Sequence, residues 1–253
     1  MERAKTDKVN NELYHALGER WYHAKDDPIA LLRAERKLLV PWVTEAIAKH
    51  SPNSSNKVLD VGCGAGLFSN PLSSIGYDVT AFDVSVESLE IARQYDKTKR
   101  VNYLLADAYE FPFSDKTFDV VCAMDFLEHV DKPEVVISEV SRVLKPNGIF
   151  FFSTFSQNWV AWLIVIKGVE WFVKNTPKNL HVLDLFIKPS ELQQILSTHN
   201  LTVDQMLGIR PCFFTKAFFQ MLLTGVVADT FSFTFTKSLL IGYGGMAVKT
   251  NHL

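Results

Sequence analysis

The sequence has few cysteines, almost no net charge and no long uncharged apolar run. Its three cysteines, Cys63, Cys122 and Cys212, lie far apart and show no metal-ligand spacing, so a reducing compartment is expected. Lys and Arg number 26 against 28 Asp and Glu, and a net charge of −2 gives no bulk attraction for nucleic acid. The first ten residues are polar, which predicts no secretory signal. These absences point away from secreted and nucleic-acid-binding proteins.

The remaining composition fits one globular domain with additions. The chain has 253 residues, and 47% of them are hydrophobic, which is enough for a large core. Ser153 lacks the surrounding pattern of a nucleophile elbow, so hydrolase chemistry has no support.

The most informative stretch is residues 57–66, Lys-Val-Leu-Asp-Val-Gly-Cys-Gly-Ala-Gly. A short apolar run of the size of a buried parallel strand stops at a Gly-x-Gly-x-Gly sequence, and a helical pattern follows from Leu67. Glycine lacks Cβ, so the turn can take unusual dihedrals and let a ligand approach its backbone. The sequence therefore predicts a ligand-binding crevice at this turn. The three glycines are Gly62, Gly64 and Gly66.

Two details of this turn favour S-adenosylmethionine over a dinucleotide. The third glycine comes one residue earlier than in Gly-x-Gly-x-x-Gly, the dinucleotide pattern. Asp60 precedes the turn, where a carboxylate would repel a pyrophosphate but would suit the ammonium group of a ligand.

Strand-like and helical patterns alternate beyond the turn, which indicates βαβ units and a parallel sheet. The fold class is therefore α/β. Expected strands lie at 78–82, 101–106, 118–124 and 149–152, and expected helices at 86–95 and 135–144, with a turn at 145–148.

Acidic residues at two strand ends are candidate nucleoside ligands. Asp83 is placed to accept hydrogen bonds from ribose hydroxyls, although it could instead cap the following helix. Asp107, followed by Ala108, could accept from the exocyclic amine of adenine, or could be a turn aspartate. Val84 and Met124 are candidates to sandwich the adenine, and either could also be a core residue.

With these features in place, the chain resembles the class I S-adenosylmethionine-dependent methyltransferases. The stretches Ala123-Met-Asp-Phe-Leu-Glu-His-Val130 and Phe186-Ile-Lys-Pro-Ser-Glu-Leu192 narrow the resemblance to the ubiquinone-biosynthesis O-methyltransferase family, and Glu19-Arg20-Trp21-Tyr22 is similar to its Arg-Trp-Trp opening. The resemblance covers about residues 10–208. It implies a Rossmann-like sheet of seven mostly parallel strands with helices on both faces. It also implies S-adenosylmethionine as cofactor and methylation of a ring hydroxyl on a polyprenylated catechol or quinol.

The resemblance further implies a divalent metal, Mg²⁺ or Zn²⁺, held by Asp125, Glu128 and His129, with Glu128 and His129 as catalytic residues. The family has glutamate where this chain has Asp125, which is one methylene shorter. Two alternatives stay open: His129 alone acts as general base, or Glu128 and His129 only start a helix that Asp125 caps.

One arginine of the family reaches the carboxylate of the cofactor, from an Asn-Pro-x-Arg segment that this chain does not reproduce. Arg33, Arg36 and Lys37 are the candidates for this role, and Arg36 is preferred. His181, which has a family counterpart, either faces the pocket or is an ordinary histidine.

Two apolar segments bear on the substrate and on membranes. Residues 155–180 hold tryptophans at helical spacing between charges, which fits an interfacial helix or a lid over the site; residues 211–237 are rich in phenylalanine and could form a tail-binding wall, a membrane patch, core or a dimer surface. The uncharged run Trp159–Ile166 is far shorter than the ~20 residues that span a bilayer.

We therefore expect an N-terminal helical cap at 1–50 and a methyltransferase domain at 51–253. The expected partners are a lipophilic aromatic substrate, a membrane surface and other biosynthetic enzymes. The expected location is cytoplasmic with peripheral membrane association, at the mitochondrial inner membrane in a eukaryote. Two rival functions remain: methyl transfer to another small molecule, and a non-catalytic subunit of a lipid-biosynthetic complex.

Overall fold

The structure, a computed structural model, describes residues 12–50 and 56–250 and contains one eight-stranded sheet. The strands are β1 (Lys57–Val61), β2 (Asp78–Asp83), β3 (Asn102–Leu105), β4 (Phe118–Met124), β5 (Leu144–Phe155), β6 (Leu201–Pro211), β7 (Phe233–Thr236) and β8 (Gly242–Lys249).

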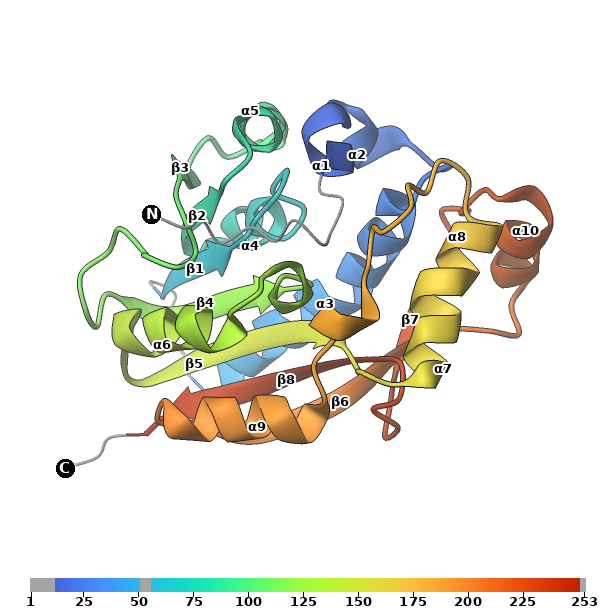
Figure 1. Cartoon of the computed structure of the whole chain (residues 1–253). Coiled ribbons are helices and arrows are strands. Elements are labelled where there is room, and N and C mark those ends of the chain that lie inside the picture. Colours follow the sequence, from blue (N-terminus) through green and yellow to red (C-terminus); the bar gives the residue numbers. More distant parts are fainter. Residues whose placement is uncertain (1–11, 51–55, 251–253) are drawn as a thin grey trace.

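The strand order is β3-β2-β1-β4-β5-β8-β6-β7 (Figure 1). Strands β1 to β5 pair in parallel, and β8 pairs antiparallel with both β5 and β6. The predicted α/β, Rossmann-like architecture is confirmed. The predicted number of seven strands is wrong by one, because Phe233–Thr236 of the Phe-rich segment pairs antiparallel with β6 and adds an edge strand.

Helices cover both faces of the sheet. They are α1 (Glu12–Ala16), α2 (Arg20–His23), α3 (Ile29–His50), α4 (Ser69–Ile75), α5 (Val86–Tyr95), α6 (Pro133–Val143), α7 (Trp159–Ala161), α8 (Val169–Phe172), α9 (Pro189–Thr198) and α10 (Lys216–Thr224), with 3₁₀ turns η1 (Leu127–His129) and η3 (Leu183–Leu185) and a π-helical segment η2 (Trp162–Gly168).

Strand β1 is buried on both faces, which explains its continuous apolar sequence. Leu59 and Val61 face a core under α6 and α9, and Val58 faces a second core under α3 and α4. Figure 1 shows α6 and α9 in front of the sheet and α3 behind it. The two cores fix β1 in place, and with it the glycine turn at its carboxyl end.

The N-terminal helices of the expected cap divide into two roles. Helix α3 buries Leu39, Val43 and Ile47 completely against the sheet, so it is a layer of the fold. Helices α1 and α2 lie beside the glycine turn, where the Tyr22 hydroxyl donates to the carbonyl of Ala65 at 2.8 Å. The N-terminal region therefore stabilises the sheet and also covers the ligand crevice.

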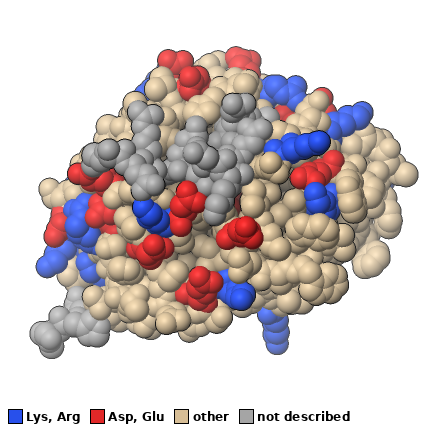
Figure 2. Space-filling view, viewed as in Figure 1, with Lys and Arg blue, Asp and Glu red and all other residues tan. Residues whose placement is uncertain are grey.

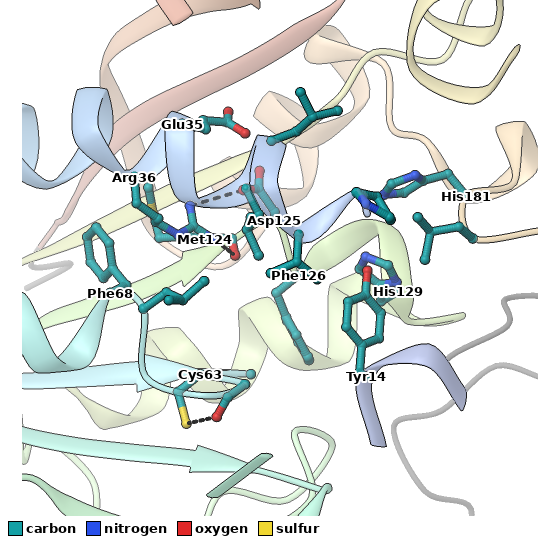
Figure 3. A pocket seen from close by; sticks show the side chains of 18 of the residues that line it. Tyr14, Glu35, Arg36, Cys63, Phe68, Met124, Asp125, Phe126, His129 and His181 are labelled. Carbon is teal, nitrogen blue, oxygen red and sulfur yellow. Dashed lines mark hydrogen bonds and ion pairs between the residues drawn. The ribbon is translucent and has the colours of Figure 1, made fainter. Parts of the chain in front are cut away.

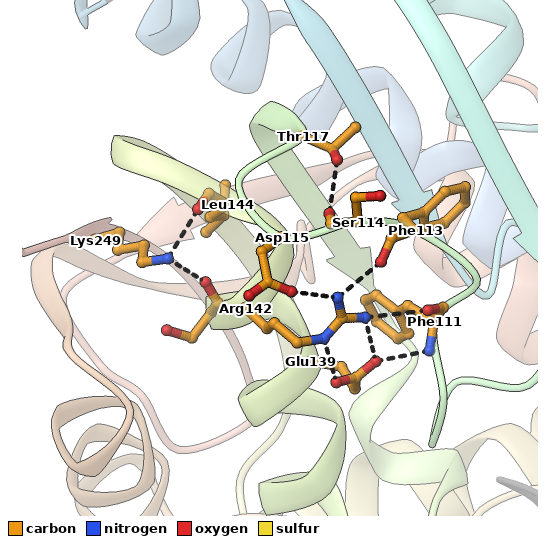
Figure 4. A network of polar contacts seen from close by, with 10 residues as sticks. Phe111, Phe113, Ser114, Asp115, Thr117, Glu139, Arg142, Leu144 and Lys249 are labelled. Carbon is orange, nitrogen blue, oxygen red and sulfur yellow. Dashed lines mark hydrogen bonds and ion pairs between the residues drawn. The ribbon is translucent and has the colours of Figure 1, made fainter.

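A polar network fixes the loop before β4 to helix α6 (Figure 4). The Arg142 guanidinium donates to both oxygens of Glu139 at 2.8 and 2.7 Å and to Asp115 Oδ1 at 2.8 Å. It also donates to the carbonyls of Phe111 and Phe113 at 3.1 and 2.7 Å. One side chain thus satisfies carbonyls and carboxylates from two segments.

Among the described helices, none is both long and apolar enough to cross a membrane.

Candidate active site

A pocket opens at the carboxyl ends of β1, β2 and β4, where the glycine turn, Asp83 and Met124 follow or end their strands. Ten of the predicted site residues line it: Arg36, Asp60, Gly62, Gly64, Asp83, Val84, Ala108, Met124, Asp125 and His129. Three predicted residues, Gly66, Asp107 and Glu128, are not among its lining residues.

The glycine turn needs glycine for steric reasons at two positions. Gly62 has φ +66°, and a Cβ there would lie 2.0 Å from a ring carbon of Phe126. Gly66 has φ +74°, and a Cβ there would lie 2.3 Å from the Tyr103 hydroxyl. Because L-residues disfavour this backbone region and the space is filled, the turn depends on glycine.

Asp83 links the turn to the next strand. Its Oδ2 accepts from the Gly64 amide at 2.8 Å, and its Oδ1 accepts from the Ser85 amide at 2.9 Å. The N-cap of α5 is Ser85, whose hydroxyl accepts from the Ser88 amide, so Asp83 is not the helix cap. Burial raises the pKa of Asp83, while the backbone amides oppose the rise. The carboxylate remains part of the pocket wall.

Asp60 lies on β1 beneath the turn and is almost completely buried. It accepts a short hydrogen bond from the Ser69 hydroxyl, and burial raises its pKa to about 6. A carboxylate in this position, at the floor of the pocket, offers negative charge to a ligand cation.

Arg36 reaches the pocket from α3, whereas the other two candidates do not line it. Its guanidinium donates to the Met124 carbonyl at 3.0 Å and pairs with Asp125 Oδ2 at 3.0 Å. Arg33 binds carbonyls of the α2 region, and Lys37 binds the Asp229 carbonyl. The preference for Arg36 thus agrees with its place in the pocket.

Asp125 has a left-handed backbone, with φ +51°, directly after β4. Its amide donates to the Ser153 carbonyl at 3.0 Å, and the Ser153 hydroxyl donates to its Oδ1 at 2.8 Å. Glu35, also in the pocket, has its pKa raised well above the usual range, first by burial and then by Asp125. Arg36 is therefore the cation beside two buried carboxyl groups.

Glu128 and His129 lie in the 3₁₀ turn η1, whose N-cap is Phe126, so Asp125 does not cap it. Burial, followed by the charge of Asp125, raises the pKa of Glu128 to about 8, while its contact with Thr154 opposes the rise. Burial lowers the pKa of His129 to about 4, and its Nδ1 has no hydrogen-bond partner. At neutral pH His129 is thus an uncharged imidazole in the pocket, and Glu128 is a neutral acid beyond the lining.

The predicted metal triad is not supported by this geometry. Asp125 is ion-paired with Arg36 and accepts from Ser153, which occupies both of its oxygens. Within residues 12–50 and 56–250, no group of three His, Cys, Asp or Glu side chains is arranged to hold a metal ion. Asp125, Glu128 and His129 as a set of metal ligands therefore stay a prediction.

Asp107 follows β3 in a turn, and its Oδ1 accepts from the Tyr109 amide at 2.9 Å. The adjacent Ala106 and Ala108 line the pocket. This contact matches the turn-aspartate alternative.

Several pocket residues were not predicted from the sequence, among them Tyr14, Glu35 and Phe155. His181, left open between pocket and surface, lines the pocket as well (Figure 3). The rings of Tyr14 and His181 both pack on His129, with centroids at 5.7 and 5.5 Å. No local signal marks these residues, because distant segments bring them to the site.

Comparison with known proteins agrees with this site. A family model described as "Methyltransferase domain" matches residues 59–152, from within β1 to β5. The ubiquinone biosynthesis O-methyltransferase of Pasteurella multocida is 37% identical over 216 residues, covering 80% of this chain and 87% of that protein. The Rickettsia canadensis protein of the same name is 31% identical over 206 residues, covering 80% and 86%.

Solved structures share the fold at low identity. Magnesium protoporphyrin IX methyltransferase from Synechocystis, with S-adenosylhomocysteine bound, superposes with a TM-score of 0.63 at 17% identity, covering 94% of this chain and 97% of that one. A methyltransferase from Thermotoga maritima gives a TM-score of 0.60 at 16% identity, covering 92% and 94%. The crevice, the matched domain and the relatives agree: this chain belongs to the ubiquinone biosynthesis O-methyltransferase family and is an S-adenosylmethionine-dependent O-methyltransferase.

Proposed function

We propose that the enzyme methylates a ring hydroxyl of a polyprenylated catechol or quinol intermediate of ubiquinone biosynthesis. The observation that carries this proposal is the imidazole of His129 in the lining of a mostly apolar pocket next to the glycine turn. The names of the relatives, at 31% and 37% identity, support the pathway.

The pocket residues suit each part of S-adenosylmethionine. In this proposal Arg36 holds the carboxylate of the methionine end, and Asp60 together with the glycine turn faces the ammonium group. The Asp83 carboxylate accepts from the ribose hydroxyls, while Val84 and Met124 flank the adenine. The charges are complementary, because the guanidinium meets an anion and the buried carboxylates meet cations or donors.

The enzyme must deprotonate the substrate hydroxyl and place it in line with the methyl group. When bound, S-adenosylmethionine supplies a methyl group on a positively charged sulfur, and the new C–O bond forms as the C–S bond breaks and leaves a neutral thioether. His129 takes the hydroxyl proton as general base, so the ring oxygen attacks as a negatively charged phenolate. Alignment within the pocket contributes to the rate because both reactants are already bound.

The acceptor side of the pocket is lined by apolar residues of the 155–180 segment. Phe155, Val165 and Val169 line the pocket, while Trp159 and Trp171 of the same segment are 72% and 63% exposed. The segment thus has one apolar side that forms a wall of the pocket and another that is exposed. We infer that a prenyl tail leaves the pocket along this wall.

The exposed apolar surface continues onto α10, which contacts α8. Phe214 is 93% exposed and Leu223 is 86% exposed, and Figure 2 shows mostly uncharged surface at the right edge, over α10. Exposed Lys174 and Lys216 lie in the same region. Aromatic and aliphatic side chains next to lysines are typical of a surface that rests on anionic lipid. We propose peripheral membrane contact here.

The activity test is methyl transfer from labelled S-adenosylmethionine to a short-tailed prenyl catechol, with product identification by mass spectrometry. Transfer to a ring oxygen is expected, and the His129→Gln variant should lose about 100-fold in rate while retaining cofactor affinity. His50→Gln, at the end of α3, is the control. A wild-type enzyme that binds the cofactor but methylates no catechol or quinol would refute the substrate assignment.

The membrane proposal is tested by co-sedimentation with vesicles of phosphatidylcholine and phosphatidylglycerol. Phe214→Ser with Leu223→Ser should reduce the bound fraction severalfold, because both side chains are almost fully exposed. Ile75→Ser, at a 57% exposed residue of α4, is the matched control. Equal binding by all variants would contradict an α10 contact.

A further inference from the structure

Two imidazoles lie side by side in the pocket, although their residues are far apart in the chain. The ring centroids of His129 and His181 are 5.5 Å apart, with an interplanar angle of 50°. His129 comes from η1 after β4, and His181 comes from the loop between α8 and η3. Figure 3 shows both on one side of the pocket, with Arg36 and Cys63 on the other.

Aromatic contacts fix the position of His181. Phe155 lies edge-on to its ring with centroids 5.2 Å apart, and Phe186 lies 6.2 Å away at 63°. The neighbouring Leu180 is buried, and Phe186 is packed into a small core with Ala161 and Val165. The imidazole is therefore held by packing, and its contacts in the described part of the chain are ring contacts.

The two rings offer polar atoms in an otherwise apolar part of the pocket. Nδ1 of His129 is buried without a hydrogen-bond partner, and phenylalanine rings cannot pair with the nitrogens of His181. A buried polar group without a partner is costly, so a ligand hydroxyl that reaches Nδ1 of His129 removes this cost, and a second hydroxyl can bind the imidazole of His181 beside it. One imidazole can hydrogen-bond only one of the two adjacent hydroxyls of such a ring.

We propose that His181 hydrogen-bonds the second hydroxyl of an ortho-dihydroxy ring, while His129 faces the hydroxyl that is methylated. His181 is then the residue that selects a catechol over a monophenol. This inference rests on the proposed function, because it assigns the substrate hydroxyls of that same site.

The experiment compares a short-tailed prenyl catechol with its monohydroxy analogue, which retains only the hydroxyl that is methylated. His181→Phe keeps an aromatic ring but removes the hydrogen bond, and His181→Gln keeps a polar side chain. Methyl transfer is measured as kcat/KM for both substrates, and binding of S-adenosylhomocysteine is measured by calorimetry. His199→Gln, at the carboxyl end of α9, is the control.

His181→Phe should lower kcat/KM for the catechol by about threefold to tenfold, the usual effect of one hydrogen bond, and should lower it by a clearly smaller factor for the monohydroxy analogue. His181→Gln should lose less, and all variants should bind S-adenosylhomocysteine as the wild type does. If His181→Phe does not fold, the same two-substrate comparison on His181→Gln decides.

Equal losses for both substrates, or no loss for either, would overturn the role of His181 while the wild-type activity still supported the proposed function. No transfer by the wild type to either ring would instead overturn the proposed function, and the role of His181 with it.

Discussion

Two arginines, the partly exposed Arg142 and the buried Arg36, show how differently a protein can use a cationic side chain. Arg142 donates to two carboxylates and two carbonyls, and its hydrogen bonds lower the pKa of Glu139. Arg36 has one carboxylate, Asp125, as its ion-pair partner, beside Glu35, whose pKa is raised. The carboxylates of the first cluster are paired with Arg142, whereas beside Arg36 the carboxyl group of Glu35 lines a pocket and has a pKa that burial raises.

The same contrast appears in two glutamates. Hydrogen bonding to Arg142 lowers the pKa of Glu139, and burial raises the pKa of Glu128 to about 8. A structural network favours the ionised form, while a group buried near a ligand site keeps its proton. Next to the pocket, Nδ1 of His129 is a buried polar atom without a partner, which has no counterpart in the network of Arg142.

Replacing each of the two arginines by lysine compares their roles most directly. Arg36→Lys should weaken S-adenosylhomocysteine binding by about tenfold to 100-fold, because lysine keeps the charge but loses the planar fork that fits a carboxylate. Isothermal calorimetry measures the affinity. Lys37→Met on the same helix is the control, and unchanged affinity in Arg36→Lys would contradict the assignment of the cofactor carboxylate to this residue.

Asp83→Ala tests the nucleoside end of the cofactor. The loss of two acceptor oxygens should weaken S-adenosylhomocysteine binding by about tenfold or more, since hydrogen bonds to a charged group are stronger than neutral ones. Asp78→Ala, at the exposed start of the same strand, should change the affinity by less than about twofold. Undiminished affinity in Asp83→Ala would refute the ribose contact.

Glu128→Gln tests the neutral acid through the pH dependence of stability. Between the ordinary pKa of 4.5 and the folded value of about 8, the folded state holds a proton on Glu128 that the unfolded chain has lost. Its contribution to stability therefore falls as pH rises through this window, by at most about 1.4 kcal/mol per pH unit. Chemical denaturation from pH 5 to pH 9 should show a flatter decline for Glu128→Gln.

Glu139→Gln is the counterpart, with the opposite sign. Its lowered pKa means that the ionised form contributes stability above the ordinary pKa, and this contribution is lost as pH falls through the folded pKa. The variant should therefore be less stable at neutral pH and should lose less on acidification. The same pH slope for both glutamine variants would contradict the contrast between the two clusters.

The smallest expected effect is that of Arg142→Lys. Loss of the fork should cost about 1–2 kcal/mol of stability and lower Tm by about 2–8 °C, because a partly exposed side chain is screened by water. S-adenosylhomocysteine affinity should stay within about twofold of the wild type. A large loss of affinity would show that the two regions are coupled.

Much of the fold follows from local patterns in the sequence. The expected helix at 86–95 and the expected strand at 118–124 match α5 and β4 residue for residue. Their apolar spacing, together with Ser85 as N-cap, specifies them without distant contacts. The glycine turn, Asp83 and Met124 are placed correctly for the same reason, because each lies at or next to the end of a recognisable strand.

The elements that the sequence did not predict depend on distant partners. Strand β7 has only four residues, and although phenylalanine and threonine favour strands, so short a run is identified as one only through its pairing with β6. The expected turn at 145–148 lies within β5, where the pairing with β4 shifts between Phe118 and Val120 and Asn147 takes φ +62°. Pairing across the sheet decided both cases.

The candidate site divides in the same way. Residues that follow strands were predicted, whereas Glu35 and Tyr14 arrive on helices whose docking the sequence does not reveal. The ion pair of Asp125 with Arg36 joins residues 89 positions apart, and it occupies the carboxylate that the metal hypothesis required. Such a competition between partners becomes visible only when the chain is folded.

Because Gly62 has no side chain, two loops pack tightly against each other. The Phe126 ring occupies the space that a Cβ at position 62 would need, so the turn after β1 and the turn after β4 are interlocked. Phe126 follows Asp125 directly in the chain, so a side chain at position 62 would push on the turn that carries Asp125. The close packing of one aromatic ring on one glycine thus connects the two loops that form opposite parts of the pocket lining.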